Sequence, residues 1–549
     1  MTTVIVGGVA GGMSAAARLR RLDDAEEVIV LERSHYVSYA NCGLPYHVGG
    51  VIADRDDLLL QSPEALRAQL GMDVRVDSEV LSVDRARSTV AVRNVITDER
   101  YELHWDHLVL SPGAVPFVPD VPGVERAFTM RTVEDMDKVK AATAALSHPL
   151  GVTPTAVVVG GGFVGLELAE NLGRAGMAVT VVELADQVLA PLDTEMAALV
   201  HSELAAHKVD VVVGTSLTKV LPDSVELSNG ATLPADVVVF AIGVRPDTAL
   251  ARQAGLELGP LGGIAVDERL RTSDPRIYAI GDAVEKEGVN DQGRVLVPLA
   301  NIANRQGRMV ADDIAGRGRP FRPVLGTAII KVFGLTAAVT GWNEKRLRAA
   351  GRPYLAVHTH PTAHAGYYPG AGRVSLKLLV DPETEAVLGA QAVGTEGADK
   401  RIDVVATAMR AGLSAPDLAD LELAYAPPYG SAKDPVNMLG YVAANRLGGQ
   451  EETVQWHELA DRVGDGALLV DVRTRGEHAL GHIPGSLNIP LDQIRQRSRE
   501  LEGRKVVVYC QVGVRAHTAG QMLRSRGFNV ANLDGGYLTW RAGTQLSHY

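Results

Sequence analysis

Cysteine is scarce in this chain of 549 residues, which contains only two, Cys42 and Cys510. With two thiols and no third, the chain cannot combine a structural disulfide with a redox-active cysteine pair, so each thiol is expected to work alone. Each would then react with a sulfur atom brought by another molecule. Sparse cysteine is typical of the reducing cytoplasm, where free thiols stay free, and we therefore predict a cytoplasmic location.

Long apolar segments and excess positive charge are also lacking. No run approaches the roughly 20 apolar residues that span a bilayer, and no signal-type segment precedes the strand-like Val4-Ile5-Val6. We therefore expect no membrane partner. The formal net charge of −12 argues against nucleic acid as a partner. With 46% hydrophobic and 22% charged residues, the chain has the composition of a globular protein, and its length predicts about three to four domains.

The first segment has the order strand, glycine turn, helix. A strand at residues 3–6 is followed by the glycine-rich turn 7–12, an Ala-rich helix at 13–21 and a second strand at 28–31 that ends at Glu32. In a dinucleotide-binding fold such glycines let the backbone approach a pyrophosphate, and the later acid accepts a hydrogen bond from a ribose hydroxyl. We predict that Gly7, Gly12 and Glu32 bind a dinucleotide. Val9 replaces the second glycine of the usual pattern, which by itself leaves a simple tight turn as the alternative.

A second copy of the same pattern follows a strand at residues 156–159. Gly160, Gly162 and Gly165 are in full register before a helix at 166–173, and the next strand, 179–182, ends at Glu183. A carboxylate there binds the free ribose hydroxyl of NADH and repels the phosphate of NADPH, so NADH is favoured over NADPH. Two motifs in one chain predict two dinucleotides that exchange electrons, and we expect the first to be FAD.

Two further segments support a flavin. Residues 271–282 end in Gly281-Asp282, where a strand-end carboxylate can contact the ribityl hydroxyls of FAD; a carboxylate that merely caps a helix is the alternative. With residues 110–114 and 241–246, which look like domain-crossing connections, the chain resembles the flavoprotein reductases of the pyridine nucleotide-disulfide family. The resemblance adds Arg33, Ser111 and Gly113 to the FAD site and Gly243 to the NADH site.

Cys42 lies in the segment 38–46, and no second cysteine is near it. The oxidised form of a lone thiolate must be a mixed disulfide, a persulfide or a sulfenic acid. This pattern resembles the coenzyme A-disulfide reductases and their persulfide-reducing relatives, which hold coenzyme A beside one cysteine. The resemblance places the following residues around coenzyme A: Ser14, Arg18, Arg21, Ser38, Asn41, Lys433 and Arg75, the last standing where relatives carry a lysine. Arginine suits phosphate, although without the resemblance these arginines are ordinary solvated helix-face charges.

The segment 321–445 resembles the dimerisation domain of that subgroup, through residues 363–370, 424–429 and 433–437. The resemblance implies a homodimer in which Tyr367 and Tyr425 reach the active site of the partner. A phenol there would hydrogen-bond or protonate the leaving thiolate. Core packing of the two rings is the alternative.

A further domain follows the polar linker 446–452. Residues 468–473, 481–486 and 506–510 resemble a rhodanese domain, with Cys510 at the start of a loop that leads into a helix. Backbone N–H groups of that loop and Arg515 would hold an anion and lower the pKa of the thiol. Cys510 would accept sulfane sulfur as a persulfide, unless the domain is an inert binding module.

The sequence therefore predicts an α/β protein with two Rossmann-like domains, an α+β dimerisation domain and a C-terminal α/β rhodanese domain. The predicted limits are 1–150 with 236–320 for FAD, 151–235 for NADH, 321–445 for dimerisation and 453–549 for the rhodanese domain. The predicted activity is NADH-dependent, metal-free reduction of coenzyme A persulfide, coenzyme A disulfide, polysulfide or glutathione persulfide, with sulfur supplied through Cys510. An NADH oxidase or peroxidase that forms a sulfenic acid at Cys42, and a sulfur sensor or carrier, are the alternatives.

Overall fold

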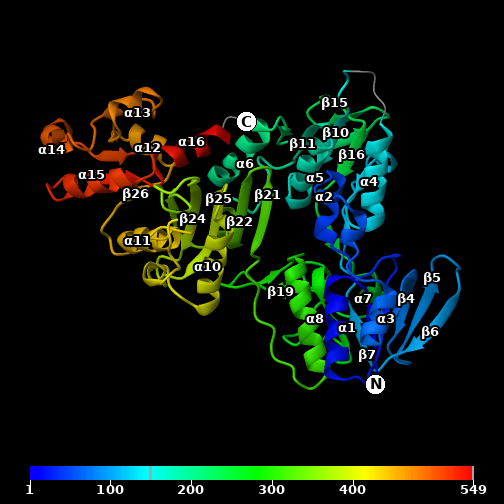
Figure 1. Ribbon diagram of the computed structural model, residues 1–549. Helices are drawn as coiled ribbons and strands as arrows, with labels where there is room; N and C mark the ends of the chain where they lie inside the picture. Colours follow the sequence, from blue (N-terminus) through cyan, green and yellow to red (C-terminus); the bar gives the residue numbers. More distant parts are fainter. Residues whose placement is uncertain (147–150, 547–549) are drawn as a thin grey trace. The chain divides into compact units, whose positions relative to one another are not determined.

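The computed structural model describes residues 1–146 and 151–546 (Figure 1). The chain divides into two compact units, one formed by Met1–Val182 and Thr215–Gly326 and the other by Glu183–Gly214 and Thr327–Tyr549. Both units are built from sheets covered by helices, as the sequence predicts. The predicted domain limit at residue 150 and the last three residues of the predicted rhodanese domain lie outside the described residues.

The first sheet of unit 1 is parallel throughout, with the order β18-β7-β1-β2-β3. Its strands are β1 (Thr2–Val6), β2 (Glu27–Leu31), β3 (Asp73–Arg75), β7 (His107–Leu110) and β18 (Ile277–Ala279). The Val- and Ile-rich strands are buried, as parallel strands covered on both faces are. Helix α1 (Ala10–Leu22) begins three residues before the predicted helix and packs on α8 (Ala300–Ile314).

A second parallel sheet of unit 1 has the order β11-β10-β16-β9. Its strands are β9 (Phe128–Thr129), β10 (Thr155–Val159), β11 (Ala178–Val182) and β16 (Val237–Phe240), flanked by α4 (Val133–Ala145) and α5 (Phe163–Arg174). The two predicted domain-crossing connections lie side by side, because β8 (Ala114–Pro116) pairs antiparallel with β17 (Val244–Pro246).

Smaller elements complete unit 1. Two antiparallel three-stranded sheets are formed by β4 (Ser78–Asp84), β5 (Thr89–Asn94) and β6 (Arg100–His104), and by β13 (Leu217–Val220), β14 (Ser224–Leu227) and β15 (Thr232–Pro234). The short helices are α2 (Leu44–Val48), α3 (Pro63–Leu70) and α7 (Ala249–Gln253), and β19 (Lys286–Glu287) pairs with β20 (Arg294–Val295).

The central sheet of unit 2 is antiparallel, with the order β21-β22-β25-β24-β23. Its strands are β21 (Ala328–Val332), β22 (Leu335–Gly341), β23 (Leu355–Thr359), β24 (Val374–Val380) and β25 (Val387–Gly394). One face packs its apolar side chains on α10 (Ala398–Ala411) and α11 (Pro435–Leu447). Other helices of this unit are α6 (Thr194–Ala206), which contacts β21, β22 and β25, and α9 (Glu344–Ala349); the segment also includes the strand β12 (Asp210–Val212).

The C-terminal part of unit 2 is a parallel sheet with the order β26-β30-β29-β27-β28. The strands are β26 (Thr453–Val454), β27 (Leu468–Asp471), β28 (Leu487–Asn488), β29 (Val506–Tyr509) and β30 (Val530–Leu533). The helices are α12 (Leu459–Gly464), α13 (Arg475–Ala479), α14 (Ile494–Arg497), α15 (Val514–Arg524) and α16 (Gly536–Leu546), and α16 packs on α6. Among the described residues, no helix combines the length and apolarity that crossing a membrane requires.

Candidate active site

The first glycine turn is closed by contacts that only glycine permits. A Cβ atom on Gly7 would lie 2.1 Å from the carbonyl oxygen of Ser111, and one on Gly12 would lie 1.8 Å from that of Gly7. Gly7 also has a φ of +99°, which L side chains rarely adopt. The turn therefore brings the start of α1 against the strand ends, the geometry in which a dinucleotide-binding helix meets its pyrophosphate.

Two carboxylates flank this turn. Glu32 accepts hydrogen bonds from the backbone N–H groups of Gly8 (2.7 Å) and Ser34 (2.9 Å), and burial raises its pKa despite these two donors. Asp282 lies in a short 3-10 helix directly after β18 and pairs with Arg131 at 3.0 Å. Both carboxylates stand at strand ends of the first sheet, and with the cradle of glycines they fit FAD. Arg33 is exposed beside Glu32, and Gly113 has a φ of +74°.

The second glycine turn repeats the first. A Cβ atom on Gly160 would lie 2.4 Å from the oxygen of Ala241, and one on Gly165 would lie 1.9 Å from the oxygen of Gly160. A Cβ on Gly162, at the start of α5, would meet no protein atom within 4 Å, which leaves that side open to a ligand. These features fit a second dinucleotide. Gly243 is exposed with a φ of +106°.

Glu183 follows the last residue of β11 in the sequence. Its carboxylate accepts a hydrogen bond from the backbone N–H of Ala185 at 2.8 Å. No basic residue stands among the three that follow it, Leu184, Ala185 and Asp186. Residues 183–186 therefore contain a carboxylate held in place, that of Glu183, and no basic side chain that could pair with a ribose phosphate.

Cys42 is exposed and lies in the 3-10 helix η1 (Asn41–Gly43). Its thiol donates to Oδ1 of Asn41 at a sulfur–oxygen distance of 3.7 Å. Partial burial and the charge of Glu167 raise the pKa of the Cys42 thiol, while Arg131 opposes them. The thiol is therefore accessible, and the positive charge of Arg131 is the nearby influence that favours the reactive thiolate.

A cavity of about 430 Å³ adjoins this cysteine segment. It brings together four of the residues predicted to bind coenzyme A, namely Ser14, Arg21, Ser38 and Asn41. The remaining lining is polar and apolar and comes from α1, α3, α8 and the segment around Leu60, with Asn304 accepting a hydrogen bond from Ser14 at 2.9 Å. Arg21 supplies positive charge to a space large enough for part of a nucleotide.

Three other residues predicted to bind coenzyme A do not line this cavity. Arg18 forms an ion pair with Asp312 at 2.7 Å. Arg75 is held by Asp73 at 2.7 Å and lies over the ring of Tyr101. Lys433 is exposed and belongs to unit 2. Arg18 is thus paired with an acid of α8 that is far away in the sequence, a contact that sequence spacing could not predict.

Glu167 is a functional candidate that the sequence analysis missed. It lies on α5, accepts a hydrogen bond from Tyr46 at 3.2 Å, and burial raises its pKa to about 7. Its charge raises the pKa of the Cys42 thiol. The available signal was an acid two residues after Gly165, in the helix that follows the second glycine turn.

The two predicted tyrosines meet in unit 2. The hydroxyls of Tyr367 and Tyr425 are hydrogen-bonded at 2.9 Å, and both side chains are exposed. The hydrogen bond raises the pKa of Tyr367. Exposure excludes the alternative of core packing, and the pair offers a phenol proton at the surface.

Cys510 follows β29 and is buried. The loop that it begins ends at Gly513, which has a φ of +93° and precedes α15. Arg515 does not point at a free space, because it forms two hydrogen bonds of 2.8 and 2.6 Å with Glu477. Arg473 donates to Gln511 in the loop at 3.0 Å. The Cys510 loop therefore begins at the end of β29 and is contacted by the guanidinium of Arg473.

Comparison with known proteins gives consistent matches. Residues 1–307 match the pyridine nucleotide-disulphide oxidoreductase family, residues 327–435 its dimerisation domain, and residues 455–543 the rhodanese-like domain. A coenzyme A disulfide reductase of Staphylococcus aureus is 34% identical over 445 residues, which are 80% of this chain and 99% of that protein.

Two solved structures cover nearly the whole chain. The crystal structure of reduced CoADR-RHD from Bacillus anthracis has 46% identity and a TM-score of 0.96, covering 99% of this chain and 98% of that one. A NAD-dependent persulfide reductase from A. fulgidus has 38% identity and a TM-score of 0.92, covering 98% and 100%. The predicted resemblance is confirmed: the chain belongs to the pyridine nucleotide-disulphide oxidoreductase family and is an oxidoreductase with a C-terminal rhodanese-like domain.

Proposed function

We propose that this protein uses NADH to reduce the sulfur–sulfur bond of coenzyme A persulfide or coenzyme A disulfide at Cys42. The observation that carries the proposal is the cavity beside a lone exposed cysteine, since Asn41 both lines the cavity and accepts a hydrogen bond from Cys42. Two relatives, a coenzyme A disulfide reductase and a NAD-dependent persulfide reductase, support this substrate class.

The reaction begins at the Cys42 thiolate. Its attack on the inner sulfur of coenzyme A persulfide breaks the sulfur–sulfur bond, releases hydrosulfide and joins Cys42 to coenzyme A in a mixed disulfide. Two electrons and a proton then return the Cys42 thiolate and release coenzyme A as a thiol. In total, one NADH, one proton and one persulfide give NAD⁺, coenzyme A and hydrogen sulfide; a disulfide gives two coenzyme A thiols instead.

Family membership implies a flavin and a nicotinamide nucleotide. Gly7, Gly12, Glu32 and Asp282 would hold FAD, and Gly160, Gly162 and Gly165 with Glu183 would hold NADH. The chemistry that bound FAD supplies is transfer of two electrons from NADH to the mixed disulfide. The carboxylate of Glu183, with no basic residue directly after it, supports NADH over NADPH.

Protonation of the leaving thiolate falls to the tyrosine pair. Tyr367 and Tyr425 share a hydrogen bond and are exposed in a domain that matches the family's dimerisation domain. In a homodimer this pair would reach the Cys42 site of the partner, where one phenol donates a proton while the other stabilises the resulting charge.

Cys510 would feed this site with sulfur. Its thiolate accepts the outer sulfur of a donor such as thiosulfate, sulfite leaves, and the resulting persulfide passes its sulfur to the thiol of coenzyme A. The ion pair of Arg515 with Glu477 fixes a guanidinium beside the loop. The fusion of both activities in one chain favours persulfide over disulfide as the substrate.

Anaerobic NADH oxidation by the purified protein tests this function. We expect kcat/KM for coenzyme A persulfide to exceed that for coenzyme A disulfide by about tenfold or more, with matching hydrosulfide release. C42S should abolish both reactions, whereas C510S should abolish only reduction that starts from thiosulfate and coenzyme A. Full activity in C42S would refute the proposal, and NADH oxidation that requires oxygen would indicate an oxidase or peroxidase instead.

A further inference from the structure

The two faces of the central sheet in unit 2 differ in chemistry. Along β24, Leu376 and Leu378 pack with α10 and α11, and strand alternation turns Lys377 to the opposite face. The strand register aligns Lys377 with His358 of β23 on one side and with Gln391 of β25 on the other. Three polar side chains therefore form a row across the sheet, and all three are buried.

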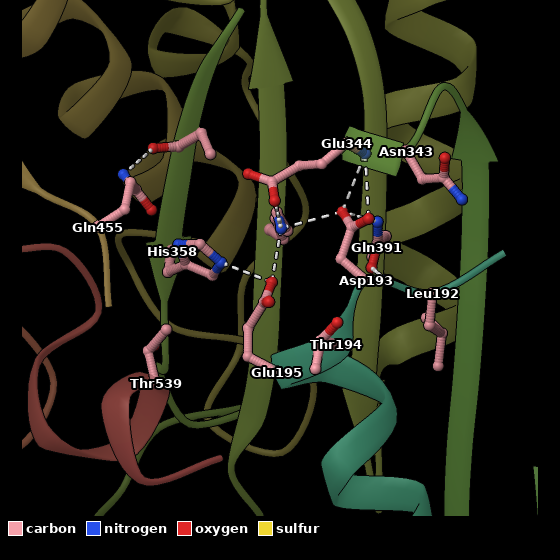
Figure 2. A network of polar contacts seen from close by, with 12 residues as sticks. Leu192, Asp193, Thr194, Glu195, Asn343, Glu344, His358, Gln391, Gln455 and Thr539 are labelled. Carbon is pink, nitrogen blue, oxygen red and sulfur yellow. Dashed lines mark hydrogen bonds and ion pairs between the residues drawn. The ribbon is translucent and has the colours of Figure 1, made fainter. Parts of the chain in front are cut away.

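His358 in this row bridges two carboxylates from distant parts of the chain. Its Nε2 lies 3.0 Å from Glu195 on α6, and its Nδ1 lies 2.7 Å from Asp534 of the rhodanese-like domain. Figure 2 shows His358 directed toward Glu195 at the start of α6. The side chain of His358 is 1% exposed, and those of Glu195 and Asp534 are 3% exposed.

The surrounding charges keep the bridge ionised. Burial alone would lower the pKa of His358, but the carboxylates of Asp534 and Glu195 raise it to about 9. Lys377 compensates further negative charge, with Nζ at 2.5 Å from Glu195, 2.9 Å from Asp193 and 3.4 Å from Glu344. At neutral pH the side chain of His358 is therefore an imidazolium, which donates one N–H to Glu195 and the other to Asp534.

Asp534 also stands directly behind the Cys510 loop. It is followed by Gly535 and Gly536, with φ values of +66° and +65°. A Cβ on Gly536 would lie 2.5 Å from the carbonyl oxygen of Cys510, and the next residue, Tyr537, donates its backbone N–H to that oxygen at 2.8 Å. A Cβ on Gly535 would lie 2.8 Å from that of His358. The segment 534–537 is thus enclosed between β23 and the loop.

We propose that His358 is a positioning residue for the sulfurtransferase loop. By holding Asp534 and Glu195 together it fixes the segment 534–537 against the backbone of residues 510–513, so the central sheet dictates the shape of the loop that receives the sulfur donor. The inference rests on the proposed sulfur-transfer role of Cys510, and it assigns a residue of the dimerisation domain to the chemistry of the rhodanese-like domain.

A matched pair of substitutions separates this role from packing. His360 lies two residues further along β23 and links Ser375 (2.9 Å) with Thr539 (2.7 Å) in the same interface. Burial lowers its pKa to about 3, so it is neutral. Glutamine can replace a neutral histidine that bonds two hydroxyls, whereas at position 358 it supplies neither the charge nor a donor in each direction for two carboxylates.

The test measures three quantities in the full-length holoenzyme for H358Q, H360Q and the wild type. They are transfer of sulfur from thiosulfate to cyanide, the rate at which iodoacetamide alkylates Cys510 as followed by mass spectrometry, and NADH-dependent reduction of coenzyme A disulfide. We expect H358Q to lower kcat/KM for sulfur transfer and to speed Cys510 alkylation by about tenfold or more, the factor for a lost charge-assisted hydrogen bond. H360Q should change both by less than about threefold, and disulfide reduction should be unchanged in both variants.

A pH series adds a readout that packing alone would not move. Deprotonation of His358 near pH 9 in the wild type should remove the bridge, so the ratio of the H358Q to the wild-type alkylation rate should fall toward one as pH rises through about 9. The charged groups that act on His358 are Asp534, Glu195 and Lys377. Lys377 also pairs with Asp193 at α6 and Glu344 on α9, the charge of Arg446 on α11 lowers the pKa of Asp534, and the charge of His358 lowers the pKa of His360 on β23.

Equal effects of H358Q and H360Q, or a ratio that does not change with pH, would overturn the inference. If H358Q is too unstable to purify, H358Q/D534N removes the uncompensated carboxylate while still lacking the bridge, so its Cys510 should be alkylated about tenfold or more faster than in the wild type. A rate equal to that of the wild type would overturn the inference. A wild-type protein that lacks sulfur transfer would refute the proposed role of Cys510, while the alkylation series would still decide whether His358 positions the loop.

Discussion

Replacement of Lys377 by methionine should destabilise unit 2 strongly. The Lys377 side chain is fully buried, and its Nζ lies within 3.4 Å of three carboxylates that are 2%, 3% and 7% exposed. Although burial would raise the pKa of Glu195, the charges of Lys377 and His358 hold it well below its usual range. Methionine fills much of the same volume but leaves these carboxylates without their cation.

Breaking a buried ion pair from one side costs about 3–5 kcal/mol of unfolding free energy. At about 2–4 °C per kcal/mol for a unit of this size, the midpoint should fall by about 6–20 °C. Differential scanning calorimetry measures the shift, and fluorescence of Trp456, whose Nε1 donates to Glu195 at 3.1 Å, reports the same site. K331M, at an exposed position of β21 in the same sheet, is the matched control and should change little.

The pH dependence gives the sharper test. Without Lys377, less positive charge opposes the effect of burial, so the pKa of Glu195 in the folded variant is higher than in the folded wild type. The variant is therefore destabilised most at high pH, and the difference shrinks as the pH falls and Glu195 binds a proton. The gap in unfolding free energy between K377M and the wild type should therefore narrow from pH 8 to pH 5. A gap below about 1 kcal/mol at pH 8, or one that stays constant with pH, would refute the reasoning.

Two predictions concern the Cys42 site. R21A should raise KM for coenzyme A disulfide by about tenfold to a hundredfold with kcat unchanged, because a charge-assisted phosphate contact is lost equally from ground and transition states. Steady-state kinetics would show a smaller rise for R18A, whose arginine is engaged by Asp312, and a larger rise for R18A would contradict the site. E167Q should move the pH midpoint of Cys42 alkylation downward, because the charge of Glu167 raises the pKa of that thiol. Below about pH 6, where a group with a pKa of about 7 is already neutral, E167Q and the wild type should react alike, and an unmoved midpoint would count against this coupling.

Local order along the chain was enough to predict the nucleotide-binding elements. Gly12 and Gly165 are required by contacts with Gly7 and Gly160 in the same turn, whereas Gly7 and Gly160 meet Ser111 and Ala241 at the ends of neighbouring strands of the sheet. The spacing of the four glycines was nevertheless enough to predict both turns. The same holds for the solitary Cys42, because the absence of a second thiol nearby is a property of composition. Helices α1 and α5 begin three residues earlier than predicted. Their first turns contain Gly11 and Gly12 in α1, and Val164 and Gly165 in α5, all residues of low intrinsic helix propensity.

Tertiary structure decided which charged side chains meet. Arg18 and Arg21 are equivalent in sequence terms, yet Arg18 pairs with Asp312 of α8, whereas Arg21 lines the cavity. Glu195, His358 and Asp534 are separated by 163 and 176 positions, and only the packing of α6 and the rhodanese-like domain on β23 joins them. The sequence by itself determines the local geometry of each turn and the chemical type of each side chain. Burial and the pairing of charges depend on elements that come together from distant positions in the chain. For this reason the proposed positioning role of His358 could be inferred only from the structure.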